Sequence, residues 1–436
     1  MADPRRLVPR TDTVLADPRM RTAAERLGPG LVRAGVRVAQ DRVRAGEVQP
    51  DDLVAAVLSD LPESPSSLRP VLNATGVLVH TNLGRAPLSA AAVSALVRAA
   101  GCTDVELDLQ TGLRGRRGRG ALAALAGAVP SAEDVHVVNN NAAALALVAT
   151  ALAPGRDIVV SRGELVEIGD GFRIPDLLAA TGARLREVGT TNRVHLEDYA
   201  AALGPDTALV LKVHPSNFVV RGFTSEVRVP ELATLGVPVV VDTGSGLLAP
   251  HPRLPDEPDA ATALRDGAAL VTASGDKLLG GPQCGLLLGR ADLVSVLRRH
   301  PMARALRVDK LTLAALEATL RGPVPPVPAR LAADVADLHE RAQRLATGLL
   351  AATVDAEVRP SIARVGGGGA PMVELPSAAV TLDPRLAGVL RAGSPAVLGR
   401  VEDGRLLLDL RAVDAADDDR LRLAVEAAAR VLTADG

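Results

Sequence analysis

Short apolar runs alternate with longer Ala- and Leu-rich segments in the middle of the chain, from about residue 69 onward. Each run has the length of a buried strand, and each longer segment has the composition of a helix. The runs are residues 135–138, 157–160, 208–211, 237–241 and 268–271. Strands that alternate with helices predict an α/β fold, with a mostly parallel sheet that is covered by helices on both faces.

The two ends of the chain differ from this middle part. Residues 1–69 contain apolar positions at helical spacing, which predict a helical N-terminal domain. A helix at residues 311–320 and a proline-rich break then lead to further helices and short strands. We therefore expect a large domain at residues 70–320 and a small α+β domain at residues 321–436. Four glycines at residues 366–369 indicate either a flexible loop or a close approach by another group.

Polar side chains follow each of the five apolar runs. These clusters are residues 139–141, 161–164, 212–217, 242–246 and 274–277. Any one of them could be a turn or a helix cap. In sheets of this type, however, ligands bind beyond the carboxyl ends of the strands. Five polar clusters at five strand ends therefore favour a binding site.

Lys277 is the residue on which such a site would centre. It lies between an apolar run and a Gly-Gly-Pro turn, and it is one of three lysines against 46 arginines. A partly desolvated amine on this loop suits a Schiff-base lysine. The alternative is a surface lysine in a β-hairpin turn. Lys212 directly follows an expected strand without a glycine turn, and Lys310 opens a helix, so both fit the role less well.

Asp242 and an asparagine triplet add what pyridoxal phosphate requires. Asp242 would keep the pyridine nitrogen protonated, so that the ring can withdraw electrons from a Cα carbanion. Asn139, Asn140 and Asn141 open a predicted helix, whose N–H groups and side-chain amides suit the 5′-phosphate, with help from Ser274.

Glu164 and His214 are the candidates for the two faces of the cofactor ring. They are chosen because aromatic side chains are scarce, with one Tyr, three Phe and no Trp. The competing assignment is a nicotinamide site, but no G-x-G-x-x-G follows the first strand, and no P-loop Gly-Lys-Ser/Thr occurs in the sequence.

Composition bears on the cellular location of the protein and on its disulfides and metals. The formal charge of −2 and the apolar fraction of 47% are those of an ordinary soluble protein. Cys102 and Cys284 form neither a disulfide framework nor a zinc site, and we expect no bound metal. The first residues lack the apolar region of a signal peptide, and no apolar run is long enough to span a bilayer. A cytoplasmic location without a membrane contact is expected.

Several longer motifs together resemble one known family. The first is RPVLNATGVLVHTNLGRA at residues 69–86, and the lysine loop reads SGDKLLGGPQ at residues 274–283. Further matching segments are residues 137–144, 160–169, 187–193, 311–320 and 399–406. Together they resemble the bacterial selenocysteine synthases, the L-seryl-tRNA(Sec) selenium transferase family. The resemblance covers nearly the whole chain. It implies a fold-type-I pyridoxal phosphate transferase, with an aspartate aminotransferase-like large domain.

The resemblance also implies a reaction. Seryl-tRNA(Sec) would lose its hydroxyl group to give an aminoacrylyl intermediate, and selenium from selenophosphate would add to it, giving selenocysteinyl-tRNA(Sec). Lys277 would first anchor the cofactor and then act as the Cα base, and Asp276 would be a second catalytic residue. Arg85, Arg304 and Arg307 match basic positions that the family uses for selenophosphate. The alternative for these arginines is a solvated helix face.

Partners are implied as well. The resemblance implies a homo-oligomer, a ring of dimers, and N-terminal helices that bind tRNA rather than DNA. Seven arginines against two acids between residues 19 and 44 fit an RNA contact, although a solvated helix face would have the same charge. Four more arginines within residues 114–119 could contact tRNA phosphates or a subunit interface.

Two other functions stay open on the sequence alone. One is a related lyase or aldolase that acts on a free amino acid or an amino sugar acid, for which the basic N-terminal segment would have no use. The other is a tRNA-binding protein that has lost its catalytic activity. A seryl ester has no free α-carboxylate, so Arg400 is not assigned as a clamp for one.

Overall fold

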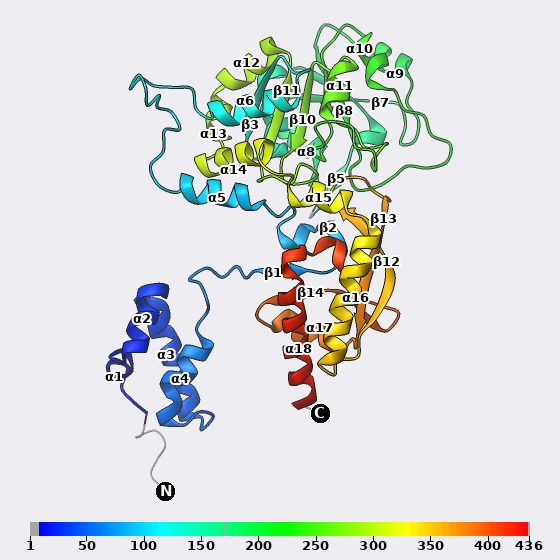
Figure 1. The fold of residues 1–436 in the computed structure, drawn as a ribbon. Coiled ribbons are helices and arrows are strands. Elements are labelled where there is room, and N and C mark those ends of the chain that lie inside the picture. The colour runs from blue at the N-terminus through cyan, green and yellow to red at the C-terminus, as the bar shows by residue number, and fades with distance from the viewer. Residues whose placement is uncertain (1–7, 170, 435–436) are drawn as a thin grey trace. The chain divides into compact units, whose positions relative to one another are not determined.

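The computed structural model describes residues 8–169 and 171–434 (Figure 1). The chain divides into two compact units, Met1–Pro70 and Val71–Gly436. No described helix is both long enough and apolar enough to cross a membrane.

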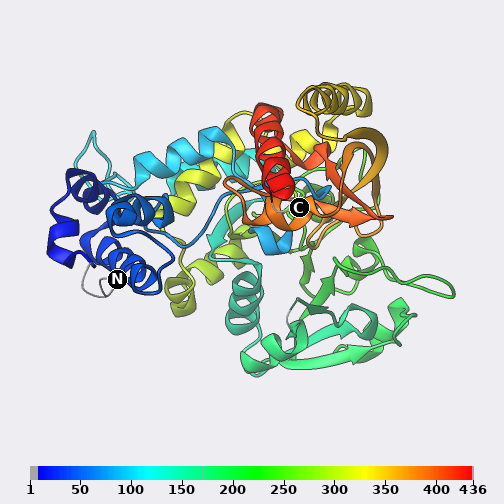
Figure 2. The ribbon, with the colours of Figure 1, turned by 90° about the horizontal axis from the view of Figure 1, so that it is seen from below.

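Helices make up the described part of the first unit (Figure 2, blue). They are α1 (Thr11–Leu15), α2 (Pro18–Leu27), α3 (Pro29–Arg44), the short 3-10 helix η2 (Pro50–Asp52) and α4 (Leu53–Asp60). Asp17 caps α2 by accepting a hydrogen bond from the N–H of Arg19. The buried side of α3, with Val32, Val36 and Val43, packs against the other three α-helices. The apolar spacing in the sequence therefore predicted the helical character of this part correctly.

A seven-stranded sheet forms the centre of the second unit. Its strand order is β3-β11-β10-β9-β8-β4-β7. The strands are β3 (Asp134–Val138), β4 (Asp157–Ser161), β7 (Arg184–Val188), β8 (Thr207–Val213), β9 (Val239–Asp242), β10 (Leu270–Ser274) and β11 (Gly285–Gly289). Only β11 runs antiparallel to its neighbours among these strands. The expected mostly parallel sheet of a fold-type-I enzyme is confirmed.

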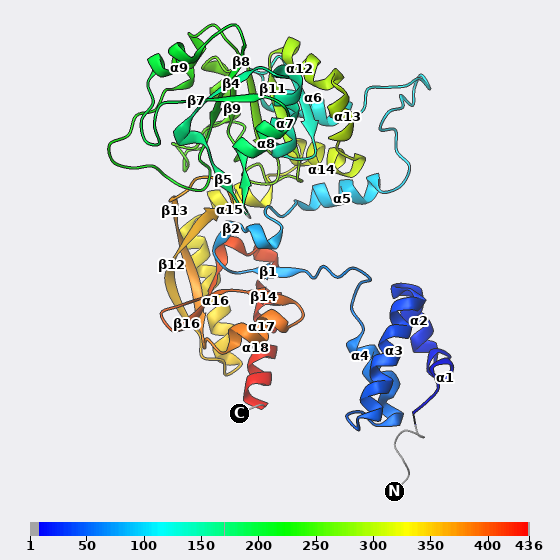
Figure 3. The same ribbon diagram turned by 180° about the vertical axis from the view of Figure 1, so that it is seen from behind.

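Helices cover both faces of this sheet because its strands are buried on both sides. On β4, Val159 faces one apolar cluster, whereas Ile158 and Val160 face the other. Figure 1 shows α6, α11 and α14 against the sheet, and Figure 3 shows α7 and α8 from behind. The helices of this layer system are α5 (Ala90–Ala99), α6 (Arg119–Ala128), α7 (Asn141–Leu152), α8 (Ile174–Ala180), α9 (Leu196–Ala202), α10 (Val229–Ala233), α11 (Ala260–Arg265), α12 (Ala291–Arg299), α13 (Pro301–Ala305) and α14 (Lys310–Arg321).

The C-terminal part contributes a second sheet, with the strand order β15-β16-β13-β12-β2. Its strands are β2 (Val77–Val79), β12 (Glu357–Gly366), β13 (Glu374–Leu382), β15 (Arg400–Glu402) and β16 (Arg405–Asp409), and β1 (Val71–Asn73) pairs separately with β14 (Ala396–Leu398). The accompanying helices are α15 (Pro326–Ala332), α16 (Val335–Ala351), α17 (Leu386–Ala392) and α18 (Asp418–Ala434). Since β1 and β2 both pair with C-terminal strands, the chain enters these sheets before it enters the large one.

Candidate active site

Lys277 lies in the turn that joins the antiparallel strands β10 and β11. The turn is tightly packed, since a Cβ on Gly275 would stand 2.5 Å from the Cys284 sulfur. Lys277 itself is only 8% exposed, so the alternative of a surface lysine in a hairpin turn is wrong. Its Nζ lies 3.4 Å from the carbonyl oxygen of Gly368, in the glycine run of the C-terminal part.

The surroundings of Lys277 lower the pKa of its amine. Burial is the main cause that lowers the pKa of Lys277, and the positive charge of Arg85 acts in the same direction. Asp242, Asp276 and Glu257 oppose the shift because they favour the ammonium form. A lowered pKa increases the fraction of nucleophilic amine at neutral pH.

Asp242 ends β9 and is buried beside this lysine. Its Oδ1 accepts three hydrogen bonds, from Asn141 Nδ2 at 2.8 Å, Thr272 Oγ1 at 3.0 Å and the N–H of Gly244 at 3.1 Å. Burial raises the pKa of Asp242, against these bonds and the charge of Lys277. Because all three bonds reach Oδ1, Oδ2 is left for a further donor, and a cationic N–H would suit it best.

The asparagine triplet joins β3 to α7, but its three members have different contacts. Asn140 caps α7 by accepting from the N–H of Ala143 at 2.8 Å, and Asn141 donates to Asp242. The side chain of Asn139 is exposed, and its backbone N–H bonds to Leu306. The side chains of Asn140 and Asn141 are thus used within the chain. What remains for a phosphate is chiefly the backbone N–H groups at the start of α7.

His214 and Glu164 lie at the ends of neighbouring strands. The backbone N–H of His214 bonds to the carbonyl of Asp242, which places His214 beside the site. The Glu164 carboxylate accepts from Lys212 Nζ at 3.1 Å and from the N–H of Val213 at 2.9 Å. Lys212 belongs to β8 instead of following it, and it is committed to this ion pair.

Arg85 and Asp276 meet directly, although 191 residues separate them in the chain. Arg85 Nη1 donates to Asp276 Oδ2 at 2.8 Å, and Gln283 lies 3.4 Å from the same oxygen. The φ of Arg85 is 68°, so its backbone is held in the left-handed region. Of the three predicted selenophosphate arginines, Arg85 is the one that the described contacts join to the lysine loop.

Arg304 and Arg307 are exposed and line a different hollow, of about 570 Å³. The same hollow is lined by Arg114, Arg116, Arg117, Arg298 and Arg299. Arg307 pairs weakly with Glu106 at 3.8 Å, and its main chain forms a bridge with Val138. The hollow therefore adjoins the Asn139 end of the site and carries a strong positive charge.

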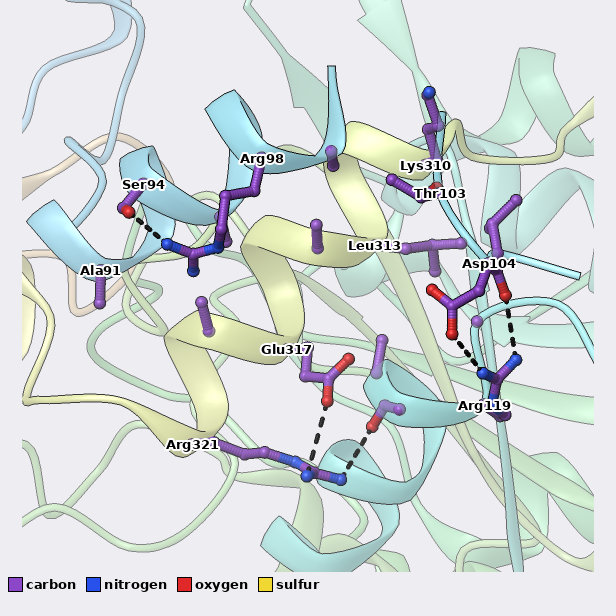
Figure 4. Close-up of a pocket in the computed structure, with 18 of the residues that line it drawn as sticks. Ala91, Ser94, Arg98, Thr103, Asp104, Arg119, Lys310, Leu313, Glu317 and Arg321 are labelled. Atoms are coloured by element: carbon purple, nitrogen blue, oxygen red, sulfur yellow. Dashed lines mark hydrogen bonds and ion pairs between the residues drawn. The ribbon is translucent and has the colours of Figure 1, made fainter. Parts of the chain in front are cut away.

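Figure 4 shows another hollow, of about 840 Å³, between α5, α6 and α14. Arg119 pairs with Asp104 and Arg321 with Glu317, whereas Arg98 donates to the Ser94 hydroxyl and Lys310 to the carbonyl of Gly101. Small residues such as Ala95 form much of the remaining lining. Each of these charged side chains has a partner within the chain, and the hollow is not lined by Lys277, so we do not assign the chemistry of Lys277 to it.

Unpaired polar atoms surround Lys277, and they test whether a polar cofactor fits. The buried atoms without a hydrogen-bond partner in this neighbourhood are His80 Nδ1, Asn141 Oδ1, His214 Nδ1, Ser245 Oγ and Glu257 Oε1. Buried polar atoms are rarely left unpaired in native proteins. Together with the free side of Asp242 and the buried amine, they fit a ligand with ring, hydroxyl and phosphate groups.

The sequence missed several residues of this site. Thr272 lies inside strand β10, two residues before the polar cluster at residues 274–277, and Glu257 lies in a proline-rich stretch that has the pattern of a surface loop. Neither had a signal that would have identified it. The close contact between Gly368 and Lys277 confirms one of the two interpretations of the glycine run, namely close approach.

Comparison with known proteins agrees with this geometry. The profile of the family described as "L-seryl-tRNA selenium transferase" matches residues 71–414, and that described as "Selenocysteine synthase N terminal" matches residues 5–44. An L-seryl-tRNA(Sec) selenium transferase of Moorella thermoacetica is 48% identical over 384 residues, covering 83% of this chain and 82% of that protein. One of Edwardsiella ictaluri is 43% identical over 442 residues, covering 93% and 95%.

Among solved structures, D-glucosaminate-6-phosphate ammonia-lyase aligns with a TM-score of 0.57 and 20% identity. The alignment covers 83% of this chain and 97% of the lyase chain. At this identity the likeness concerns the fold alone.

Proposed function

Because the chain belongs to the L-seryl-tRNA selenium transferase family, we propose that it converts L-seryl-tRNA(Sec) into L-selenocysteinyl-tRNA(Sec), with selenophosphate as the selenium donor. The observation that carries the proposal is the buried Lys277 amine, which shares its site with the buried carboxylate of Asp242. The reaction belongs in the cytoplasm, where aminoacyl-tRNAs are made and used.

The enzymes of this family depend on pyridoxal phosphate. When bound, this cofactor withdraws electrons from Cα of the substrate and so stabilises a carbanion there. In this chain Lys277 would hold its aldehyde carbon, and Asp242 Oδ2 would face its pyridine nitrogen. The first backbone N–H groups of α7, with Ser274 nearby, would hold its phosphate.

The residues around the lysine have distinct tasks in the proposed reaction. Released by the incoming substrate, the Lys277 amine takes the Cα proton, a role that its lowered pKa supports. Arg85 provides positive charge for the selenophosphate anion, and the hydrogen bond that it donates to Asp276 fixes the direction of its guanidinium. His214 remains the candidate for one face of the ring and Glu164 for the other. The Glu164 carboxylate is already paired with Lys212, so Glu164 is the weaker of the two candidates for a face of the ring.

The hydrogen bonds and ion pairs of Arg400 favour an ester substrate over a free amino acid. Its guanidinium donates to the carbonyl of Thr75 at 2.7 Å and to Ser361 at 2.7 Å, and it pairs with Asp409 and Glu402. All three of its nitrogens therefore have partners inside the chain. A lyase for free amino acids needs an arginine that can bind the α-carboxylate with two hydrogen bonds, and Arg400 is not available for that.

Two basic surfaces suit the two anionic substrates of the proposed reaction, tRNA and selenophosphate. In the first unit, Arg33 and Arg37 lie one turn apart on α3, are exposed, and have no ion-pair partner among the described residues. In the second unit, Arg304 and Arg307 stand in the arginine-lined hollow, where they would supply charge for selenophosphate. We also propose that the chain acts as a homo-oligomer, a ring of dimers, in which neighbouring subunits complete each site.

Purified protein mixed with seryl-tRNA(Sec) and 75Se-labelled selenophosphate tests the proposal. We expect labelled selenocysteinyl-tRNA(Sec), with little product from seryl-tRNA(Ser) and none from Lys277→Ala. A protein that binds seryl-tRNA(Sec) but transfers no selenium would contradict the activity. Turnover of free serine at a comparable rate would favour the lyase.

A further inference from the structure

Glu257 is a buried carboxylate for which the proposed reaction has no role. It lies between β9 and α11, and the residue is 7% exposed. Its one side-chain neighbour within 4 Å among the ion pairs of the described residues is His214, whose Nδ1 is 3.9 Å from Glu257 Oε1. Removing a carboxylate from water is costly unless it is paired or hydrogen-bonded. A buried glutamate with one free oxygen therefore points to a task for that oxygen.

Two buried atoms without partners face each other across this gap. Glu257 Oε1 and His214 Nδ1 both lack a hydrogen bond in the part of the chain that the structure describes. At 3.9 Å they are too far apart for a hydrogen bond, but a small rotation of the imidazole would bring them together. Such contacts are often loose before a ligand binds and tighten afterwards. With Nδ1–H donated to Glu257, the ring plane and the tautomer of His214 would both be fixed.

The other oxygen of Glu257 reaches the glycine run. Glu257 Oε2 accepts a hydrogen bond of 2.6 Å from the N–H of Ala370. Ala370 has a φ of 46°, a left-handed conformation that needs support from its surroundings. Two residues earlier, the carbonyl of Gly368 lies 3.4 Å from Lys277 Nζ. One carboxylate thus holds the segment that covers the lysine.

We propose that Glu257 is a positioning residue, which orients His214 through Oε1 and holds residues 368–370 against Lys277 through Oε2. The inference rests on the proposed function, because it assigns Glu257 a task only if Lys277 and His214 serve a bound pyridoxal phosphate. Glu257 touches neither the cofactor nor the reacting atoms in this account.

Glu257→Gln separates the two tasks. Its amide oxygen can still accept from Ala370, but its NH2 group would face His214 and force Nδ1 to act as an acceptor. We expect the variant to bind the cofactor fully, to show altered circular dichroism of the cofactor band, and to lose about 10–100-fold in kcat. Glu257→Ala should in addition bind the cofactor more weakly. The adjacent, exposed Asp256 provides the matched control, Asp256→Asn, which should behave as wild type.

A double-mutant cycle with His214→Asn is the second measurement. If Glu257 acts through His214, Glu257→Gln should lower kcat by less than about 3-fold in the His214→Asn background. The proposal is overturned if Glu257→Gln matches wild type in kcat and circular dichroism, or if its full loss persists without His214. Wild-type protein without a cofactor band, or without selenium transfer, would instead contradict the proposed function, so the two failures are distinct.

Discussion

At the scale of single residues, the site buries a basic and an acidic side chain, Lys277 and Asp242, next to each other. Burial lowers the pKa of Lys277 and raises the pKa of Asp242, so each charged form is disfavoured by desolvation and favoured by the other. A bound cationic ring would change this balance because it would give Asp242 a second partner. The chemistry of the two groups can therefore be tested separately, with and without cofactor.

Removing the buried amine should change how stability depends on pH. The native pKa of Lys277 is lowered below its ordinary value of 10.5, so between the two values the unfolded chain binds more protons than the native protein. The free energy of unfolding of the cofactor-free protein should therefore rise with pH across this window and level off near 10.5. Urea unfolding at several pH values should show this slope, and Lys277→Met should lose it. Lys310→Met is the control, and an unchanged slope in Lys277→Met would contradict the prediction.

Asp242→Asn should leave the cofactor bound and impair the chemistry. The variant keeps an acceptor for Asn141 and Thr272 but loses the charge opposite the ring nitrogen. A charge-assisted hydrogen bond contributes about 1.5–3 kcal/mol, which corresponds to a loss of about 10–150-fold in kcat. Steady-state kinetics with seryl-tRNA(Sec) measure this loss. Thr272→Val removes only one supporting donor and should cost less than about 10-fold, and the reverse order of effects would contradict the assignment.

At the scale of elements, the close approach between the glycine run and the lysine turn brings the C-terminal part to the active site. Residues 367–369 follow β12, which ends at Gly366, whereas Lys277 follows β10, so elements of two different sheets build one site. A Cβ on Gly368 would stand 2.6 Å from Lys277 Nζ, closer than real Cβ atoms come.

Gly368→Ala should accordingly weaken cofactor binding. The φ of Gly368 is 83°, so alanine adds backbone strain as well as the clash with Lys277. Gly404, with a φ of 71° and open space around it, is the matched control for the strain alone. Both variants should lose about 1 kcal/mol of stability, but only Gly368→Ala should raise the Kd for pyridoxal phosphate in a titration. Equal affinities in both would show that the close approach has no effect on the site.

Local pattern explains why some elements were predictable and others were not. The buried runs of β4, β8 and β9 are apolar on both faces, so their sequences identify them as inner strands. Strand β7 lies at the sheet edge and has three charged residues among its five, so no apolar run identified it. Likewise, Asp242 directly follows an apolar run and Lys277 lies in the polar cluster after another. Glu257, by contrast, acts through contacts with residues 43 and 113 positions away, which no local pattern encodes.

At the scale of the whole molecule, pairing over long sequence distances determines how the chain is assembled. Strands β1 and β2 pair with β14 and β12, more than 280 residues later, which the expected boundary at residue 70 did not foresee. The N-terminal unit, by contrast, has its own apolar core and could be recognised from its helical spacing alone.

Charge reversal on α3 should weaken tRNA binding without affecting the chemistry. Arg33→Glu with Arg37→Glu should raise the KM for seryl-tRNA(Sec). In a plot of log K for tRNA binding against log salt concentration, the slope should become shallower by about one unit for each phosphate contact that is lost. The cofactor band and kcat at saturating tRNA should stay as in wild type. Arg391→Glu with Arg430→Glu, two exposed arginines of the other unit, is the charge-matched control. An equal effect from both pairs would indicate a general charge effect in place of a binding surface.

The central claim is that Lys277 holds the cofactor, and the chain has only two other lysines, Lys212 and Lys310. Borohydride reduction of the pyridoxal phosphate-loaded protein, followed by peptide mass spectrometry, fixes the cofactor on the amine that holds it. We expect the pyridoxyl mass on the peptide that contains Lys277 and on neither of the other two. Modification of Lys212 or Lys310 with Lys277 unmodified, or no modification at all, would contradict the account.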